Sequence, residues 1–429
     1  MSQDAFARIT ITEPVDGDPA NTSYAFASSV EGRQITLAND MSLQPTGLRS
    51  SAIMAGIKYP GVYDMSLVVM DKPGPAAGIF TRNRSASSSV HIDRAHLADG
   101  KGQALVVISK NANVFTPTDH ADAVRVCTLA AENLGIAPND VMISCTGVIG
   151  VSLPMPVVEA GVKAACDALQ PGLLPTVAQA ILTTDKGPKT CSAAFGDVRI
   201  AGMAKGAGMI EPNMATMLVY FFTNLDIPAD KLHASLARLS DATFNSISVD
   251  SDTSTSDSMI IFSTATVPYS DALFADFEAA LAAMMSKLSR EVVYQAEGAT
   301  KLIEAKVLQA GDQLQARQVA KFIINSPLVK TAVFGNDPNW GRIVMALGKP
   351  GQERDSAIDP KGVIIKMGGA TLFSGGAAVP LDLAGLSAKL KGLKKVDIEV
   401  TLGEGDHSWT AWGCDLSYDY VKTNADYTS

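Results

Sequence analysis

Short apolar runs alternate with longer amphipathic stretches along the chain. Residues 104–109, 141–143 and 217–222 are apolar runs of the length and composition of buried strands. The last of these runs follows a stretch that contains several glycines and a proline, which is typical of a turn. These runs predict strands of a buried sheet.

Two longer stretches have the spacing of helices. Thr118 can cap a helix that runs through Leu134, and Asp271 opens a second helix. The apolar residues that we expect to face inward recur at helical intervals: Ala121, Val124, Leu129 and Ala130 in the first helix, and Leu273, Phe274, Phe277, Leu281, Met284, Met285 and Leu288 in the second. We interpret the two methionines as core residues, because an unbranched thioether fills irregular gaps.

The two ends of the chain add further strands. Near the C-terminus, one alternating set of apolar residues predicts a strand, and residues 409–416 continue as an apolar and aromatic run. That alternating set is Val396, Ile398, Val400 and Leu402. Near the N-terminus, Ile9 and Ile11 alternate with polar neighbours and predict an extra strand. At 429 residues, the chain is long enough for two domains.

Composition and charge narrow the classes of function. The chain is 47% hydrophobic and 18% charged, which suits a globular protein with a large core, and no apolar stretch reaches the length of a membrane helix. Its formal charge of −9 argues against a nucleic-acid partner, because phosphate binding needs a basic face. The stretch from Met1 to about Asp40 has acidic residues near its start and does not show the basic and then apolar pattern of an export signal, so we expect a cytoplasmic protein with small-molecule partners.

The side chains that commonly bind metals show no metal-binding pattern. The five cysteines lack a Cys-x-x-Cys pair and the five histidines lack ligand spacing, which argues against a zinc site. Cys145 is expected to be a buried packing residue, because no neighbour in the sequence would lower the pKa of its thiol. Residues 250–257 are rich in aspartate, but their spacing does not fit a calcium loop, and a polar loop with local hydrogen bonds is the better interpretation.

The stretch from Lys205 to Leu218 contains the chemistry that organises the chain. It is not a phosphate loop, because Lys205 precedes the glycines. Thr216 lies at the start of the predicted strand, and a threonine hydroxyl is a good nucleophile only beside a base. The α-amino group of Thr216 becomes such a base if the chain is cut after Ala215. The alternative is an ordinary glycine turn that leads into a core strand.

Six motifs occur in the order and approximate spacing of one family. They are 144–150 (SCTGVIG), 183–185 (TTD), 205–218 (KGAGMIEPNMATML), 244–255 (FNSISVDSDTST), 326–331 (SPLVKT) and 337–342 (DPNWGR). The chain therefore resembles the ornithine acetyltransferase (glutamate N-acetyltransferase) family of self-cleaving enzymes, from about Pro45 to Ser429.

The resemblance implies a fold and a division of the chain. The fold is α/β, with layered sheets flanked by helices as in ornithine acetyltransferases and the related aminopeptidases, and with a smaller C-terminal α/β domain. It divides the chain into an N-terminal extension outside the resemblance (1–42), a main catalytic domain (43–310) that is cut between residues 215 and 216, and a C-terminal region (311–429) whose tail completes the active site. It also implies an assembly of cleaved chains, α2β2 or larger.

The resemblance further implies the reaction and its residues. Thr216 accepts an acetyl group from N2-acetylornithine and passes it to glutamate, while Thr146 and Gly147 stabilise the oxyanion. The residues implied to bind substrate are Thr183, Lys205, Thr216, Glu297, Asn424 and Ser429. Neither a metal nor another cofactor is implied, and acetyl-CoA is an alternative acetyl donor.

Two departures from the family pattern leave alternatives open. Glu211 stands where histidine or alanine is common, so a carboxylate near the cut could alter the acceptor or the rate of cleavage, and residues 115–120 also depart from the pattern. The alternatives are an acyltransferase for another amino acid in specialised metabolism, a self-cleaved hydrolase of the aminopeptidase type, and an uncleaved binding protein.

Overall fold

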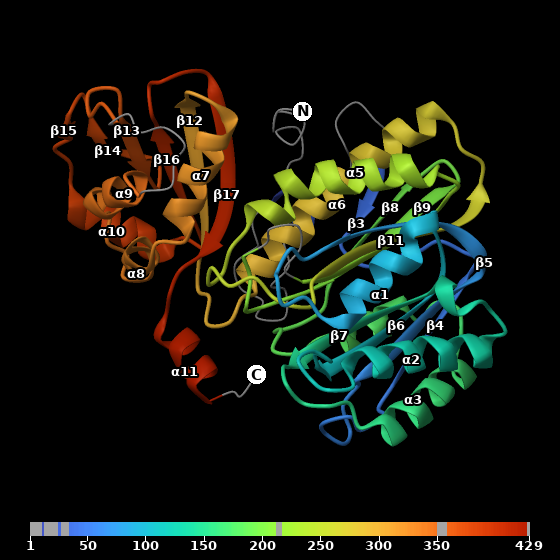
Figure 1. The fold of residues 1–429 in the computed structure, drawn as a ribbon. Helices are drawn as coiled ribbons and strands as arrows, with labels where there is room; N and C mark the ends of the chain where they lie inside the picture. Colours follow the sequence, from blue (N-terminus) through green and yellow to red (C-terminus); the bar gives the residue numbers. More distant parts are fainter. Residues whose placement is uncertain (1–10, 13–24, 27–33, 212–216, 350–357, 427–429) are drawn as a thin grey trace.

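The computed structural model describes residues 11–12, 25–26, 34–211, 217–349 and 358–426. The described residues form a nine-stranded sheet, a six-stranded sheet and a short two-stranded ribbon. Figure 1 shows the nine-stranded sheet with its helices at the right and the six-stranded sheet with its helices at the left. No helix in these ranges is long and apolar enough to cross a membrane.

The strands of the large sheet come from the first two thirds of the chain. In spatial order they are β3 (Thr36–Ala38), β8 (Lys189–Phe195), β9 (Val198–Lys205), β10 (Leu218–Leu225), β11 (Ser258–Val267), β5 (Met65–Phe80), β6 (Lys101–Asn111) and β7 (Val141–Val148), and β4 (Leu48–Ile53) also pairs with β5. Its helices are α1 (Ser88–His96), α2 (Asp119–Leu134), α3 (Met155–Asp167), α4 (Leu174–Ala180), α5 (Ala229–Ala242) and α6 (Asp271–Tyr294), with 3₁₀ turns η2 (Leu97–Asp99), η3 (Pro138–Asp140) and η4 (Phe244–Ser246). The strands predicted at 104–109, 141–143 and 217–222 are confirmed.

The long strand β5 joins two halves of this sheet that pack against each other. Its first part pairs with β4 and β6, whereas its last part pairs with β11. Alternate side chains of β10 enter two different cores, because side chains in a strand point to opposite faces. Tyr220 and Phe222 share a core with Leu105 and Val107 of β6, whereas Phe221 packs with α5 and α6.

Helices cover the outer face of each half of the sheet. Helices α5 and α6 lie on the side of β8 to β11, and α2 and α3 lie on the side of β6 and β7. In Figure 1, α5 and α6 run along the top of this part and α2 and α3 along the bottom. The predicted α/β fold of layered sheets flanked by helices is confirmed.

Helix α2 has its predicted length, and its buried face agrees with the prediction in part, because Ala130 is buried and Leu129 packs against the same core. Ala121 and Val124 are exposed, and the face that packs against α3 and β7 contains Ala123, Val126 and Cys127. The inward positions predicted for Ala121 and Val124 are therefore wrong. The helix is rich in alanine, so more than one side of it is apolar enough to pack, and the neighbouring elements decide which side does. The residue before the helix is Thr118, whose hydroxyl donates to the Asp122 carboxylate instead of capping a backbone N–H.

The second sheet forms its own core. It contains β12 (Leu302–Ala310), β13 (Ile364–Met367), β14 (Ala370–Ser374), β15 (Ala377–Ala378), β16 (Lys395–Thr401) and β17 (His407–Cys414), with helices α7 (Gln313–Ile324), α8 (Pro327–Phe334), α9 (Trp340–Leu347), α10 (Leu383–Gly392) and α11 (Tyr418–Asp426). The alternating residues 396–402 are buried, which confirms the predicted strand. Strand β12 ends at Ala310, the last residue of the predicted main domain, yet it pairs with β16 and β17 of this sheet. The exact domain boundaries stay predictions.

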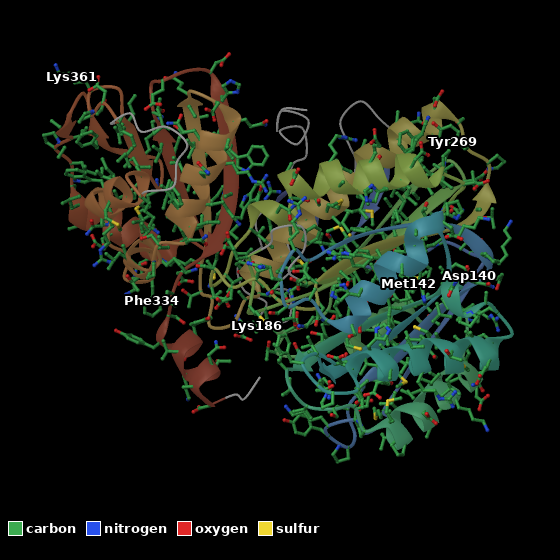
Figure 2. All side chains as sticks on the ribbon, in the orientation of Figure 1. Asp140, Met142, Lys186, Tyr269, Phe334 and Lys361 are labelled. Carbon is green, nitrogen blue, oxygen red and sulfur yellow. The ribbon has the colours of Figure 1, made fainter. Side chains whose placement is uncertain are left out.

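Side-chain contacts join the two parts. Lys186, labelled in Figure 2, donates to the Ala299 carbonyl in the segment that leads into β12 (3.2 Å). The start of α11 packs at Gly298, where an added Cβ would lie 2.2 Å from the Tyr420 backbone nitrogen. The short ribbon pairs β1 (Ile11–Thr12) with β2 (Ala25–Phe26). Ile11 thus lies in a strand, whereas Ile9 is outside the described residues.

Candidate active site

A cavity of about 100 Å³ lies where four strands of the large sheet begin or end. The C-terminal ends of β7 and β9 contribute Thr146, Gly147 and Lys205 to its lining. Met217 and Asp257, which directly precede β10 and β11, also line the cavity. Residues that are far apart in the sequence therefore meet at one end of the sheet.

Most of the residues predicted from the motifs line this one cavity. The described members of the set are Thr146, Gly147, Thr183, Lys205, Glu297 and Asn424. Ala215, Thr216 and Ser429 lie outside the described residues. Met217, which follows Thr216 in the chain, is itself part of the cavity wall.

Gly147 is held in a position that no other residue could occupy. Its φ is +136°, and a Cβ at this position would lie 2.2 Å from the carbonyl carbon of Lys110. Both facts follow from the irregular end of β7 against β6, where the register shifts near Lys110 and Asn111. Gly147 therefore lines the cavity in a conformation, and against a neighbouring strand, that only glycine allows.

Lys205 supplies a half-buried cation to the cavity. Its Nζ donates to the Thr146 hydroxyl (3.3 Å), which connects the ends of β9 and β7. Burial lowers the pKa of Lys205, although the carboxylates of Asp185, Asp257 and Glu297 partly oppose this shift. A cation in this position suits a substrate carboxylate.

A buried ion pair fixes the segments on either side of the cavity. Asp185 and Lys189 are 2.6 Å apart and their side chains are fully buried. The Asp185 carboxylate also accepts the Gly206 N–H (2.7 Å) and the Thr183 N–H (3.2 Å). Asp185 belongs to a recognised motif, but its hydrogen bond to Gly206 could not be read from the sequence, because the two residues are 21 positions apart.

Glu297 and Asn424 form the opposite wall. Asn424 on α11 donates to the Glu297 carboxylate (2.9 Å), and the Glu297 N–H donates to the Ala207 carbonyl (2.9 Å). The carboxylate packs directly on Gly208, where an added Cβ would lie 2.4 Å from Oε2. A side chain at position 208 would therefore displace the Glu297 carboxylate from its place in the cavity.

Asp257 is a cavity residue that the sequence analysis did not select. It is 2% exposed, and its Oδ2 has no hydrogen-bond partner among the described residues. Burial raises the pKa of the Asp257 carboxyl well above its usual range, although the Ser254 hydroxyl and the Lys205 charge oppose the shift. The one signal for it in the sequence was its place at the end of the aspartate-rich stretch 250–257, just before the apolar residues 259–262.

Asp250 links the cleavage segment to the C-terminal helix. Its carboxylate accepts the N–H groups of Met209 and Ile210 (both 2.7 Å) and the Tyr420 hydroxyl (3.2 Å). It also accepts the Asp252 N–H (3.4 Å), a local bond of the kind predicted for this polar loop. Asp250 therefore works as a hydrogen-bond acceptor for main-chain and tyrosine groups.

The structure also places Cys145 and Glu211, which the sequence analysis singled out. Cys145 is fully buried, and burial raises the pKa of its thiol to about 12, so its predicted packing role is confirmed. The Glu211 carboxylate pairs with Lys321 of α7 (3.0 Å), while its effect on the reaction stays a prediction. Within the described ranges, no group of three or more histidine, cysteine or acidic side chains could hold a metal ion.

The chain was compared with known proteins. The model of the ArgJ family matches residues 49–429. The arginine biosynthesis bifunctional protein ArgJ of Thermus thermophilus is 40% identical over 390 residues, which cover 90% of this chain and 99% of that protein. A glutamate N-acetyltransferase of Methanosarcina mazei is 40% identical over 391 residues, which cover 87% of this chain and 96% of that protein.

A solved structure with a similar sequence is ornithine acetyltransferase from Mycobacterium tuberculosis in complex with ornithine. It has a TM-score of 0.40 and 33% identity, and the match covers 42% of this chain and 100% of that chain.

Proposed function

Because the chain belongs to the ArgJ family, we propose that it is an acetyltransferase of arginine biosynthesis that moves an acetyl group from N2-acetylornithine to glutamate. The motif resemblance names both substrates, and similar proteins are named as glutamate N-acetyltransferase and as ArgJ. The proposal includes self-cleavage between Ala215 and Thr216, with Thr216 as the nucleophile.

One observation supports the proposal above the others. The predicted oxyanion pair Thr146 and Gly147, the predicted carboxylate-binding Lys205, and Met217 line the same small cavity. Met217 is bonded to Thr216, so the chain reaches this cavity at the residue that follows the proposed nucleophile. A turn that merely led into a core strand would not need a half-buried cation beside a strand end that only glycine can occupy.

The proposed cleavage creates the base that the reaction needs. The Thr216 hydroxyl attacks the Ala215 carbonyl, and the amide becomes an ester as the nitrogen of Thr216 takes up a proton. Water then hydrolyses the ester and leaves a free α-amino group, whose unperturbed pKa is about 7.7–8.0. Near neutral pH, a substantial fraction of this amine is unprotonated and can accept a proton from the hydroxyl.

Acetyl transfer then follows in two half-reactions. The Thr216 oxygen attacks the acetyl carbonyl of N2-acetylornithine, the bond to N2 breaks, and the α-amine returns its proton to the departing ornithine nitrogen. The unprotonated amine of glutamate next attacks the acetyl ester and restores the hydroxyl. In each half-reaction, Thr146 and Gly147 stabilise the negative charge of the tetrahedral intermediate.

The remaining cavity residues orient the amino acid. Lys205 binds the α-carboxylate, while Thr183, Glu297 and Asn424, together with Ser429, position the rest of the substrate. The exchange needs no cofactor, and acetyl-CoA stays an alternative donor. A cytoplasmic location and an assembly of cleaved chains are further parts of the proposal.

Incubation of the purified protein with N2-acetylornithine, alone and with a panel of amino acids, tests the function. The donor alone should release ornithine and add one acetyl group to the chain that begins at Thr216, as read by intact mass. Glutamate should then receive the acetyl group. Release of ornithine only when donor and acceptor are both present would contradict the covalent route, and release of free acetate at the same rate with and without glutamate would favour the hydrolase alternative.

A further inference from the structure

The proposed reaction places two side chains of opposite charge in one cavity. The reacting atom is N2 in both substrates, and both have an α-carboxylate, so their α-carbons occupy equivalent positions. The side chain of ornithine then ends in an ammonium group where that of glutamate ends in a carboxylate. A fixed charge at this place would attract one substrate and repel the other.

The described part of the cavity contains three charged or titratable side chains, Lys205, Glu297 and Asp257. Lys205 is the partner proposed for the α-carboxylate that both substrates share. Glu297 accepts a hydrogen bond from Asn424 (2.9 Å) and lies against the main chain of Gly208. Asp257 is the most buried of the three groups, at 2% exposure, and its Oδ2 lacks a partner among the described residues.

The position of Asp257 is fixed by its main chain. Its carbonyl accepts the Thr81 N–H (3.0 Å), and the next residue, Ser258, donates to the Met217 carbonyl (3.0 Å). The Thr81 hydroxyl donates to the Ser254 carbonyl (2.9 Å), which braces the same loop. The Asp257 side chain is therefore held beside the start of β10, where the chain leaves the proposed nucleophile.

We propose that Asp257 is the specificity-determining residue that lets one subsite accept side chains of opposite charge. In its ionised form it pairs with the ammonium of an ornithine-type side chain. In its neutral form it donates a hydrogen bond to the γ-carboxylate of glutamate. This inference rests on the proposed function and identifies the group that recognises the far end of the substrate.

The electrostatic surroundings of Asp257 suit such a change of protonation. Burial favours the neutral acid, whereas the Ser254 hydroxyl and the Lys205 charge on β9 favour the carboxylate. A bound ammonium adds a positive charge and shifts the group to the carboxylate. Ornithine binding should therefore release the Asp257 proton to solvent, whereas glutamate binding should retain this proton or take one up.

Calorimetric titrations of the wild-type protein with ornithine and with glutamate measure this proton exchange directly. Each titration is repeated near pH 7 in buffers of different ionisation enthalpy, and norvaline serves as a ligand with an uncharged side chain. We expect ornithine to release more protons than norvaline, and glutamate to release fewer or to take protons up. Equal proton exchange for all three ligands would overturn the proposal without the need for any variant.

Asp257→Asn separates recognition from packing. The amide keeps a hydrogen-bond donor for the γ-carboxylate but cannot ionise, so ornithine affinity should fall about 10- to 100-fold and glutamate affinity should stay within about three-fold. The ligand-dependent difference in proton exchange should disappear. Asp252→Asn is the matched control, since Asp252 lies in the same loop but does not line the cavity. An equal loss for both ligands, or no loss, would assign Asp257 a structural role only.

The same measurements distinguish this inference from the proposed function. If the wild-type protein transfers acetyl groups and binds both amino acids, but Asp257→Asn does not discriminate between them, the inference fails and the function stands. If the wild-type protein neither binds these amino acids nor transfers acetyl groups, the proposed function fails, and the inference fails with it.

Discussion

Among single residues, Gly147 offers the sharpest test of the cavity's chemistry. Gly147→Ala should lower kcat/KM for acetyl transfer by about 10²- to 10³-fold, the usual effect of losing one oxyanion donor. The reason is steric, because the new Cβ would lie 2.2 Å from the Lys110 carbonyl carbon at a φ of +136°. Gly392→Ala is the control, since no heavy atom lies within 4 Å of its added Cβ. Steady-state kinetics of the folded Gly147→Ala variant measure this effect. Wild-type activity in that variant would exclude the oxyanion role of Gly147.

Lys205 should matter for transfer more than for folding. Lys205→Ala should lower kcat/KM for both substrates by roughly ten- to a few hundred-fold, because a charge-assisted bond to a carboxylate contributes about 1.5–3 kcal/mol. Lys205→Arg should restore only part of this loss, because the wider guanidinium must fit beside Gly206, where an added Cβ would already meet Ile210 at 3.2 Å. Lys163→Ala on the exposed face of α3 serves as the control. Unchanged kinetics would show that Lys205 does not bind substrate.

Asp185 should make the stability of the protein depend on acid pH. Burial opposes its ionisation, but Lys189, Lys205 and the Gly206 N–H outweigh burial and lower the pKa of Asp185 to about 2. A carboxylate with a lowered pKa stabilises the fold above its unfolded value of about 3.9. This contribution, about 2–3 kcal/mol, is lost as pH falls from about 4 towards 2. Denaturant unfolding at several pH values measures the loss.

The matching variant is Asp185→Asn, which should lack that component of the pH dependence. It should also lower the free energy of unfolding near neutral pH by about 3–5 kcal/mol, because Lys189 remains buried without its partner. A variant with wild-type stability and wild-type pH dependence would show that the pair contributes little.

Among helices and strands, α11 is held in place mainly by polar contacts. The structure records no buried residue among its described positions. Tyr420 reaches Asp250, Asn424 reaches Glu297, and the preceding Ser417 donates to the Gly298 carbonyl (2.6 Å). Because Asp250 also binds the N–H groups of Met209 and Ile210, it connects α11 with the segment that precedes the proposed cut.

Variants of Tyr420 and Asp250 should separate the contact of Asp250 with α11 from its contact with the segment before the proposed cut. Tyr420→Phe removes one hydrogen bond to α11 and should raise KM about three-fold while self-cleavage stays near the wild-type rate. Asp250→Ala removes the acceptor for two main-chain N–H groups and should slow self-cleavage at least ten-fold. Denaturing gels over time report cleavage, and steady-state kinetics report KM. Equal effects of the two variants on cleavage would argue against this division of roles.

For the complete chain, self-cleavage should give two polypeptides that remain one particle. The proposed cut separates residues 1–215 from 216–429, yet β10 pairs with β9 and β11 pairs with β5 across it. Every described residue of β10 is buried, so separation would expose the centre of two cores. Intact mass under denaturing conditions should show two chains, and native mass should show their complex.

Thr216→Ala should remain uncut, because it lacks the attacking hydroxyl. A fully active wild-type preparation that contains only the uncut chain would refute self-cleavage. Chains that separate under native conditions would instead contradict the role assigned to the shared sheet.

The sequence determined those features that depend on neighbouring residues. The apolar run 217–222 had to be a buried strand, because six consecutive residues without charge cannot face water on both sides. Thr146 and Lys205 could be selected because their motifs occur as short, ordered segments, and Glu297 because the family resemblance implies it. The structure brings all three to one cavity.

Only the tertiary structure decided the features that depend on distant partners. The face that α2 buries is set by α3 and β7, and an alanine-rich helix alone does not specify it. The hydrogen bond between Asp250 and Tyr420 spans 170 positions of the chain. Asp257 became a candidate only when folding placed it in the cavity at 2% exposure, beside Lys205. Burial and electrostatic partners control the chemistry of a carboxyl group, and both are properties of the packed molecule, not of the local sequence.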